Sequence, residues 1–207
     1  MLIENHKEEV PFAYYQEKFA SLDPAEAVSR VGECYQNGAF YVSLLGKQYT
    51  VSHPDGSVLP VGADAHIGPQ AAPSLPVQTF LLRWLLEGKK QPFAGKFLTF
   101  REMPWGELYI KPYTGRVLTR AAFTFGTRLS AFAAACEKLG ARKLSRGDAG
   151  YEFQLLPGLL IQILVWQGDD EFPPNAQVLY SDNFGALAAE DRVVAGDILI
   201  NTIKANM

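Results

Sequence analysis

The chain has 207 residues, of which 48% are hydrophobic and 20% are charged, and its formal net charge is −3. A chain of this length buries roughly 70–75% of its unfolded surface, which is enough for a sizeable core without disulfides or metals. The near balance of acids and bases lacks the basic excess that binding to a phosphate backbone requires. We therefore exclude nucleic acid as an expected partner and predict one domain spanning residues 1–207.

Cysteine usage and the first residues of the chain indicate the compartment. Cys34 and Cys136 form neither a CxxC motif nor a disulfide framework, so both are predicted to be free thiols in a reducing environment. Residues 1–12 carry acids where a secretory signal is basic, and no apolar run reaches the length of a membrane span. We expect a cytoplasmic protein with no membrane contact, and no pattern specifies its oligomeric state.

The first part of the chain is predicted to contain two helices followed by a β-meander. Apolar spacing predicts a helix over 8–20, and Asp23 followed by Pro24 marks the start of a second helix. Over 39–61 the pattern changes to strand-type alternation interrupted by tight turns, which is typical of a meander. The segment 63–76 contains three prolines and is predicted to be a surface loop.

The second part of the chain mixes helices and strands in blocks. In chain order we expect a helix between Pro76 and Gly88, a strand over 97–102 turning at 104–106 with 107–110 as its hairpin partner, a helix over 128–139, strands over 151–155, 159–166 and 177–180, and a C-terminal helical segment from Glu190. Blocks of this kind favour an α+β fold with a mostly antiparallel sheet and helices packed on it, in a single compact domain.

An apolar run that ends in three acids is the first candidate for chemistry. Only Gln162 interrupts the run over 159–166, which is typical of a strand buried on both faces, and Asp169, Asp170 and Glu171 follow it. These carboxylates can hold a hard divalent cation or supply a general acid and base. In the alternative interpretation they cap backbone amides in a solvated turn.

The strand over 97–102 supplies the second candidate. Its alternation places Arg101 and Glu102 on opposite faces, and Trp105 lies in the turn that follows. Arg101 either forms a structural ion pair with an acid of the 169–171 loop or binds a ligand carboxylate or phosphate beside the Trp105 ring. We predict that Arg101 or Glu102 lies within salt-bridge distance of a charged group in the 169–191 region.

Other catalytic and metal-binding signatures do not occur. His6, His53 and His66 are scattered without metal-ligand spacing, and the chain has no HExxH, GxGxxG, GxxxxGK[ST] or GxSxG motif. The sequence therefore indicates no set of metal ligands and no activated nucleophile, and it does not specify a cofactor.

Three segments together resemble a known family. They are PDGSV, FLLRWLLEGKKQPFAGKFLTFREMPWG and LPGLLIQILVWQGDDEFPPNAQVLYSDNFGALAAED, and their most specific parts are the Phe-Arg101-Glu102-x-Pro turn, the acidic loop with Phe172-Pro173, and the Tyr-x-Asp182 segment that leads to Glu190-Asp191. In order and composition they resemble the bacterial and archaeal family catalogued as domain of unknown function 3786, found widely in anaerobes. The resemblance implies a cytoplasmic single-domain protein with no assigned activity. Some relatives carry an added cysteine-rich iron–sulfur segment, which nothing in this chain matches.

These observations lead to one preferred function and two alternatives. We expect a domain that binds a small molecule or cofactor in a cleft, where the ordered loop 168–174 faces Arg101 and Trp105. The alternatives are a metal-assisted hydrolase or lyase that uses the 169–171 carboxylates, and a protein-interaction scaffold with an aromatic surface. The candidate ligand-binding residues are Arg101, Glu102, Trp105, Asp169, Asp170, Glu171 and Asp182.

Overall fold

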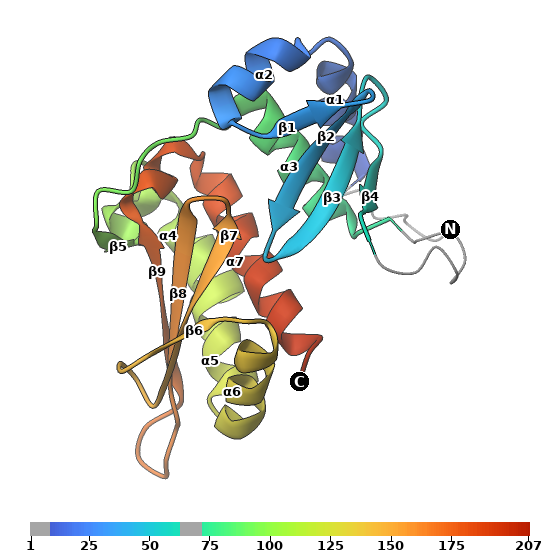
Figure 1. Ribbon diagram of the computed structural model, residues 1–207. Helices are drawn as coiled ribbons and strands as arrows, with labels where there is room; N and C mark the ends of the chain where they lie inside the picture. The colour runs from blue at the N-terminus through green and yellow to red at the C-terminus, as the bar shows by residue number, and fades with distance from the viewer. Residues whose placement is uncertain (1–8, 63–71) are drawn as a thin grey trace, which may run out of the picture. The chain divides into compact units, whose positions relative to one another are not determined.

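The computed structural model describes residues 9–62 and 72–207, and contacts within the chain divide it into two compact units, residues 1–90 and 91–207. Each unit contains an antiparallel sheet and helices (Figure 1), so the predicted α+β class is confirmed. Most of the predicted proline-containing loop lies outside the described residues. The expectation of a single domain stays a prediction, and each unit is considered by itself.

The first unit consists of helices and a β-meander, as predicted, and its sheet has one further strand, β1, which lies before the predicted range 39–61. Its elements are α1 (Glu9–Ala20), α2 (Pro24–Val31), β1 (Cys34–Gln36), β2 (Ala39–Leu44), β3 (Lys47–Ser52), β4 (Val58–Pro60) and α3 (Leu75–Glu87), with the strands paired in chain order. The Asp23 carboxylate caps α2 by accepting from the amide of Ala25 at 2.9 Å, and Gly32 ends the helix with a left-handed φ of 73°. Phe19, Phe40 and Leu81 are fully buried in this unit.

The second unit is built on a five-stranded antiparallel sheet. Its strands are β5 (Phe97–Thr99), β6 (Arg142–Leu144), β7 (Ala149–Leu156), β8 (Leu159–Trp166) and β9 (Asn175–Ser181), in the order β5-β9-β8-β7-β6. The central position of β8 explains its apolar composition, because Ile163 and Leu164 point to opposite faces and both are fully buried. The predicted bounds and two-sided burial of this strand are confirmed.

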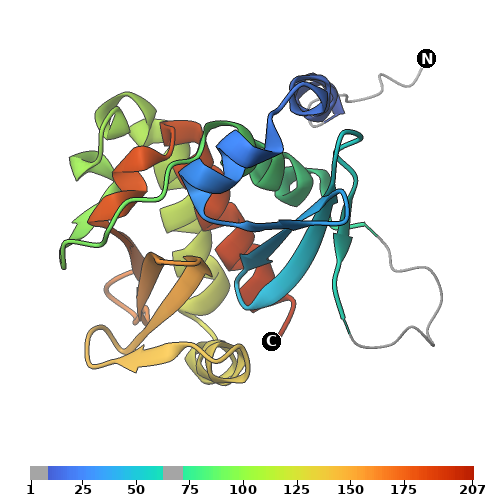
Figure 2. The ribbon, with the colours of Figure 1, turned by 45° about the horizontal axis from the view of Figure 1, so that its top comes forward.

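The second unit also contains several helical segments. They are η1 (Phe100–Glu102), α4 (Gly106–Tyr113), the π-helical segment η2 (Thr114–Thr119), α5 (Arg120–Phe125), α6 (Leu129–Lys138), η3 (Asp182–Ala186) and α7 (Ala189–Lys204). Helices α5, α6 and α7 lie behind the sheet in Figure 1, and Figure 2 shows them on the same side. The α6 face that the sequence predicts to be buried carries Phe132 and Cys136, both fully buried.

Two predictions for the second unit are wrong. The strand predicted over 97–102 ends at Thr99, because residues 100–102 form the 3-10 helix η1, so Arg101 and Glu102 do not alternate along a strand. Residues 107–110 form the first turns of α4 rather than a hairpin strand. The chain turns more tightly before Gly106 than a β-hairpin does. A Cβ atom at Gly106 would lie 1.9 Å from the Phe100 carbonyl oxygen, and Trp105 takes a left-handed φ of 60°. Four residues of alternating pattern are too few to separate a strand from a short helix, so tertiary packing decides.

Candidate functional site

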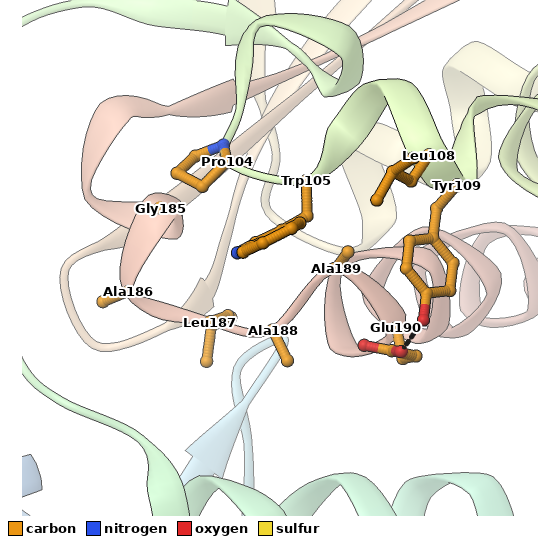
Figure 3. A pocket seen from close by; sticks show the side chains of 10 residues that line it. All are labelled: Pro104, Trp105, Leu108, Tyr109, Gly185, Ala186, Leu187, Ala188, Ala189 and Glu190. Atoms are coloured by element: carbon orange, nitrogen blue, oxygen red, sulfur yellow. Dashed lines mark hydrogen bonds between the residues drawn. The ribbon is translucent and has the colours of Figure 1, made fainter.

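A cleft of about 470 Å³ lies in the second unit between the start of α4 and the segment that leads into α7 (Figure 3). We call it the Trp105 groove. Its walls are mostly apolar, and its volume falls in the range of about 300–1,000 Å³ that is typical of small-molecule sites. The lining residues are Pro104, Trp105, Leu108, Tyr109, Gly185, Ala186, Leu187, Ala188, Ala189 and Glu190.

Trp105 forms one wall of the groove in an unusual conformation. Its side chain is 72% exposed, and its φ of 60° places a bulky residue in the left-handed region. Such a backbone conformation costs on the order of 1–3 kcal/mol and persists only where the surroundings impose it. Here the amide of Gly106 donates to the Met103 carbonyl at 3.0 Å, and Gly106 packs directly against Phe100. The indole is therefore held at the groove by the tight turn beneath it.

The buried side chain of Arg192 connects the two walls. It is fully buried on α7, and its guanidinium donates to the carbonyl oxygens of Pro104 and Leu187, the latter at 3.1 Å. Burial lowers the pKa of Arg192, and the guanidinium lies 5.6 Å from the centre of the Phe100 ring. Because Pro104 belongs to one wall and Leu187 to the other, Arg192 sets the spacing between them.

A polar pair closes one end of the groove. The Tyr109 hydroxyl donates to Oε1 of Glu190, and Figure 3 shows the two side chains pointing toward each other from α4 and α7. This hydrogen bond raises the pKa of the Tyr109 phenol, which therefore stays a neutral donor. Glu190 also lies in the first turn of α7, where a negative charge is favourable. The groove thus has an aromatic and aliphatic body and one carboxylate at its end.

The acidic loop forms a closed turn away from this groove. Oδ1 of Asp169 accepts from the amides of Phe172 at 2.7 Å and Glu171 at 2.9 Å, and these bonds lower the pKa of Asp169. The loop precedes Asn175 in β9, whereas β5 pairs with the other end of that strand. None of residues 168–174 lines the groove. The structure therefore does not bring Asp169, Asp170 and Glu171 together with Trp105, and Asp169 acts as a backbone cap.

The other acids predicted for the site also accept hydrogen bonds from the protein itself. Glu102 accepts from the amide of Thr99 at 2.8 Å and from its hydroxyl at 2.7 Å, which lowers the pKa of Glu102. Asp182 accepts from the amides of Ala94 at 3.0 Å and Lys96 at 3.2 Å. These carboxylates shape the segments before and after β5.

Arg101 has a partner close to it in the sequence. Its Nε lies 3.0 Å from a carboxylate oxygen of Glu107, and both side chains are more than 60% exposed. The contact that the structure gives Arg101 is thus with the first turn of α4 rather than with the 169–171 loop. Of the seven predicted ligand-binding residues, Trp105 lines the groove.

Comparison with models of protein families assigns the chain to a family. The model of the family described as domain of unknown function (DUF3786) matches residues 23–202, which is most of the chain. The chain belongs to this family. No curated protein and no solved structure matches it. The matched range includes both walls of the Trp105 groove, so the groove is part of the DUF3786 domain.

Several groove residues of this DUF3786 domain were not predicted from sequence. The sequence pattern predicts a strand at Leu108 and Tyr109, and it marks Glu190 as the start of the C-terminal helical segment. Arg192 is the one base among the buried residues of α7, which are mostly apolar apart from Asp191. Nothing in the sequence, however, shows that this helix start meets the turn at Trp105.

The state of the two cysteines of the DUF3786 domain agrees with the sequence prediction. Cys34 is exposed and Cys136 is buried, and both are free thiols, as predicted. Burial raises the pKa of Cys136. Within residues 9–62 and 72–207 no three side chains of His, Cys, Asp and Glu gather closely enough to hold a metal ion. His66 lies outside these ranges, and no described helix is long and apolar enough to cross a membrane.

Proposed function

We propose that this DUF3786 domain is a cytoplasmic binding module that takes a small organic ligand in the Trp105 groove. The observation that carries the proposal is the state of Trp105 itself, a largely exposed indole held at a left-handed φ beside a cleft of about 470 Å³. Exposing the ring and straining the backbone both oppose folding. A ligand that covers the indole offsets the first of these costs.

The construction of the groove supports ligand capture. Arg192 holds the Pro104 and Leu187 walls by their backbones, so little ordering is required on binding. Leu108 and Leu187 offer apolar contact, while the Tyr109–Glu190 pair supplies polar groups at one end. An apolar cleft with few polar groups that fix orientation is typical of small-molecule sites.

The test uses Trp105 as a reporter. Of the three tryptophans, Trp84 is almost fully buried, Trp166 is part-buried and outside the groove, and Trp105 is the most exposed. A ligand that covers the Trp105 indole is therefore expected to shift the fluorescence emission to shorter wavelength. In a screen of organic cofactors and metabolites, a ligand should raise the melting temperature and shift the emission together. Both effects should disappear in Trp105→Leu.

The matched control for this test is Phe172→Ala. Phe172 is 67% exposed, close to the value for Trp105, but it lies in the β8–β9 loop outside the groove. The control should bind as the wild type does. Ligands whose stabilising effect survives in Trp105→Leu would contradict the proposal.

A protein-interaction scaffold is the second candidate function. Trp105 and Leu108 are 72% and 73% exposed and lie three residues apart at the start of α4, which favours a contact with a partner surface. A pull-down in which Leu108→Ser and Trp105→Leu both lose the same partner would support it. The 169–171 carboxylates gain no such support as a metal-assisted hydrolase site, because Asp169 is engaged by backbone amides.

A further inference from the structure

We infer that the Trp105 groove binds an organic ammonium cation, and this inference rests on the proposed binding function. Among the ten lining residues, all of them in the described part of the chain, Glu190 has the one formally charged side chain, and that charge is negative. Two aromatic rings, those of Trp105 and Tyr109, line the same groove. The lining therefore complements a positive charge carried on an apolar frame.

The aromatic residues contribute the first part of this recognition. A cation is attracted to the face of an aromatic ring, most strongly to tryptophan, by about 0.5–2 kcal/mol depending on desolvation. Trp105 is 72% exposed, so its ring is accessible to a ligand. In Figure 3 the indole extends from the start of α4 toward Leu187 and Ala188 across the groove. The aliphatic side chains there suit the carbon atoms that carry an ammonium group.

The carboxylate contributes the second part. Oε1 of Glu190 accepts from the Tyr109 hydroxyl, which orients the carboxylate. Each carboxylate oxygen has two acceptor sites, so Glu190 can accept from an ammonium N–H in addition to its protein contacts. A charge-assisted hydrogen bond of this kind is stronger than one between neutral groups.

An anionic ligand fits the groove less well. The N-terminal ends of α4 and α7 carry partial positive charge, which by itself favours an anion. However, Glu107 lies in the first turn of α4, and Glu190 and Asp191 lie in the first turn of α7. These full charges offset the partial ones, and an anion in the groove would also approach the Glu190 carboxylate. Arg192 also carries a positive charge behind the walls, but its guanidinium donates to the backbone carbonyls of Pro104 and Leu187 and does not line the groove. The charged side chain that lines the groove is that of Glu190, and its sign favours a cation.

The experiment compares three probes that share a benzyl group and differ in charge. Benzylammonium, benzyl alcohol and phenylacetate are titrated into the full chain, with Trp emission and calorimetry as readouts. We expect benzylammonium to bind at least about tenfold more tightly than the neutral alcohol, a ratio of affinities that one charge-assisted contact can supply. Phenylacetate should bind more weakly than either. Raising the salt concentration should weaken benzylammonium binding selectively.

Two isosteric variants locate the charge. Glu190→Gln keeps an oxygen that accepts from Tyr109 but removes the negative charge, so benzylammonium affinity should fall about tenfold while benzyl alcohol affinity stays unchanged. Glu107→Gln is the control, because Glu107 pairs with Arg101 and does not line the groove. It should leave both affinities unchanged.

The outcomes separate this inference from the proposed function. If benzyl alcohol or phenylacetate binds as tightly as benzylammonium and Trp105→Leu abolishes that binding, the cation inference is overturned while the binding function stands. Equal losses in Glu107→Gln and Glu190→Gln would also overturn it. If none of the three probes alters Trp105 emission, the cation inference fails, and the wider ligand screen decides the binding function separately.

Discussion

Replacing Arg192 by methionine tests how the two walls of the groove are held together. The change removes the buried guanidinium while keeping a long side chain of similar volume. It leaves the carbonyl oxygens of Pro104 and Leu187 without their donor, because both accept from Arg192, in a buried contact at Leu187 and a part-buried contact at Pro104. The contact with Phe184 is 3.5 Å long and is expected to contribute little.

The magnitude follows from these two carbonyls. Each buried acceptor left unsatisfied costs about 1–3 kcal/mol. Removing the guanidinium also relieves the desolvation that lowers the pKa of Arg192, which offsets part of the loss. We expect the free energy of unfolding to fall by about 2–4 kcal/mol, and the melting temperature of a chain of this size to fall by roughly 5–15 °C.

Urea denaturation followed by circular dichroism measures this loss. Arg128→Met is the matched control, because exposed Arg128 donates to one backbone carbonyl, that of Thr124 at 3.2 Å, and lies outside the groove. This control is expected to change stability by less than about 0.5 kcal/mol. Arg192→Lys keeps the charge but has a single ammonium group, so it should fall between the wild type and Arg192→Met. A loss below about 1 kcal/mol in Arg192→Met, with Trp105 emission and ligand affinity unchanged, would refute the role assigned to Arg192.

Two further predictions concern the close packing of Gly106 and the protonation of the buried Glu33. Gly106→Ala should destabilise the fold by about 1–3 kcal/mol or more, because the added Cβ would lie 1.9 Å from the Phe100 carbonyl oxygen. Gly115→Ala is the control: nothing lies within 4 Å of its added Cβ, so it should be neutral or stabilising in the same urea experiment. Burial raises the pKa of the Glu33 carboxyl in the folded state above its unfolded-state value. As the pH rises through this interval, folding requires a buried negative charge, so the wild type should lose stability relative to Glu33→Gln. Glu33→Gln is a suitable comparison because the Gln side chain can still accept from Nε1 of Trp84. The free energy of unfolding of both proteins is measured between about pH 4 and 8, and a loss of stability in Glu33→Gln relative to the wild type as the pH rises would contradict the raised pKa of Glu33.

Local sequence patterns determined much of the fold. Asp23 predicted the start of α2 because its carboxylate and the amide that it caps lie two residues apart. The apolar run over 159–166 predicted β8 with its observed bounds, since a strand covered on both faces requires apolar residues at successive positions. In both cases the information that selects the structure lies within a few residues of the element itself.

The site depended on contacts between distant segments. The helix start at Trp105 follows from the close approach of Gly106 to Phe100, and the opposite wall comes from residues 185–190, which reach it only through the packing of α7. For the same reason, the sequence identified Asp182 as a candidate ligand-binding acid but could not show that its carboxylate accepts from backbone amides of another segment. An aspartate or glutamate reads the same in the sequence whether its carboxylate binds a ligand or caps a loop. The sequence by itself therefore determined elements such as α2 and β8 and placed Trp105 in a turn. Tertiary packing decided that residues 107–110 are helical and that Trp105, Tyr109 and Glu190 share one groove.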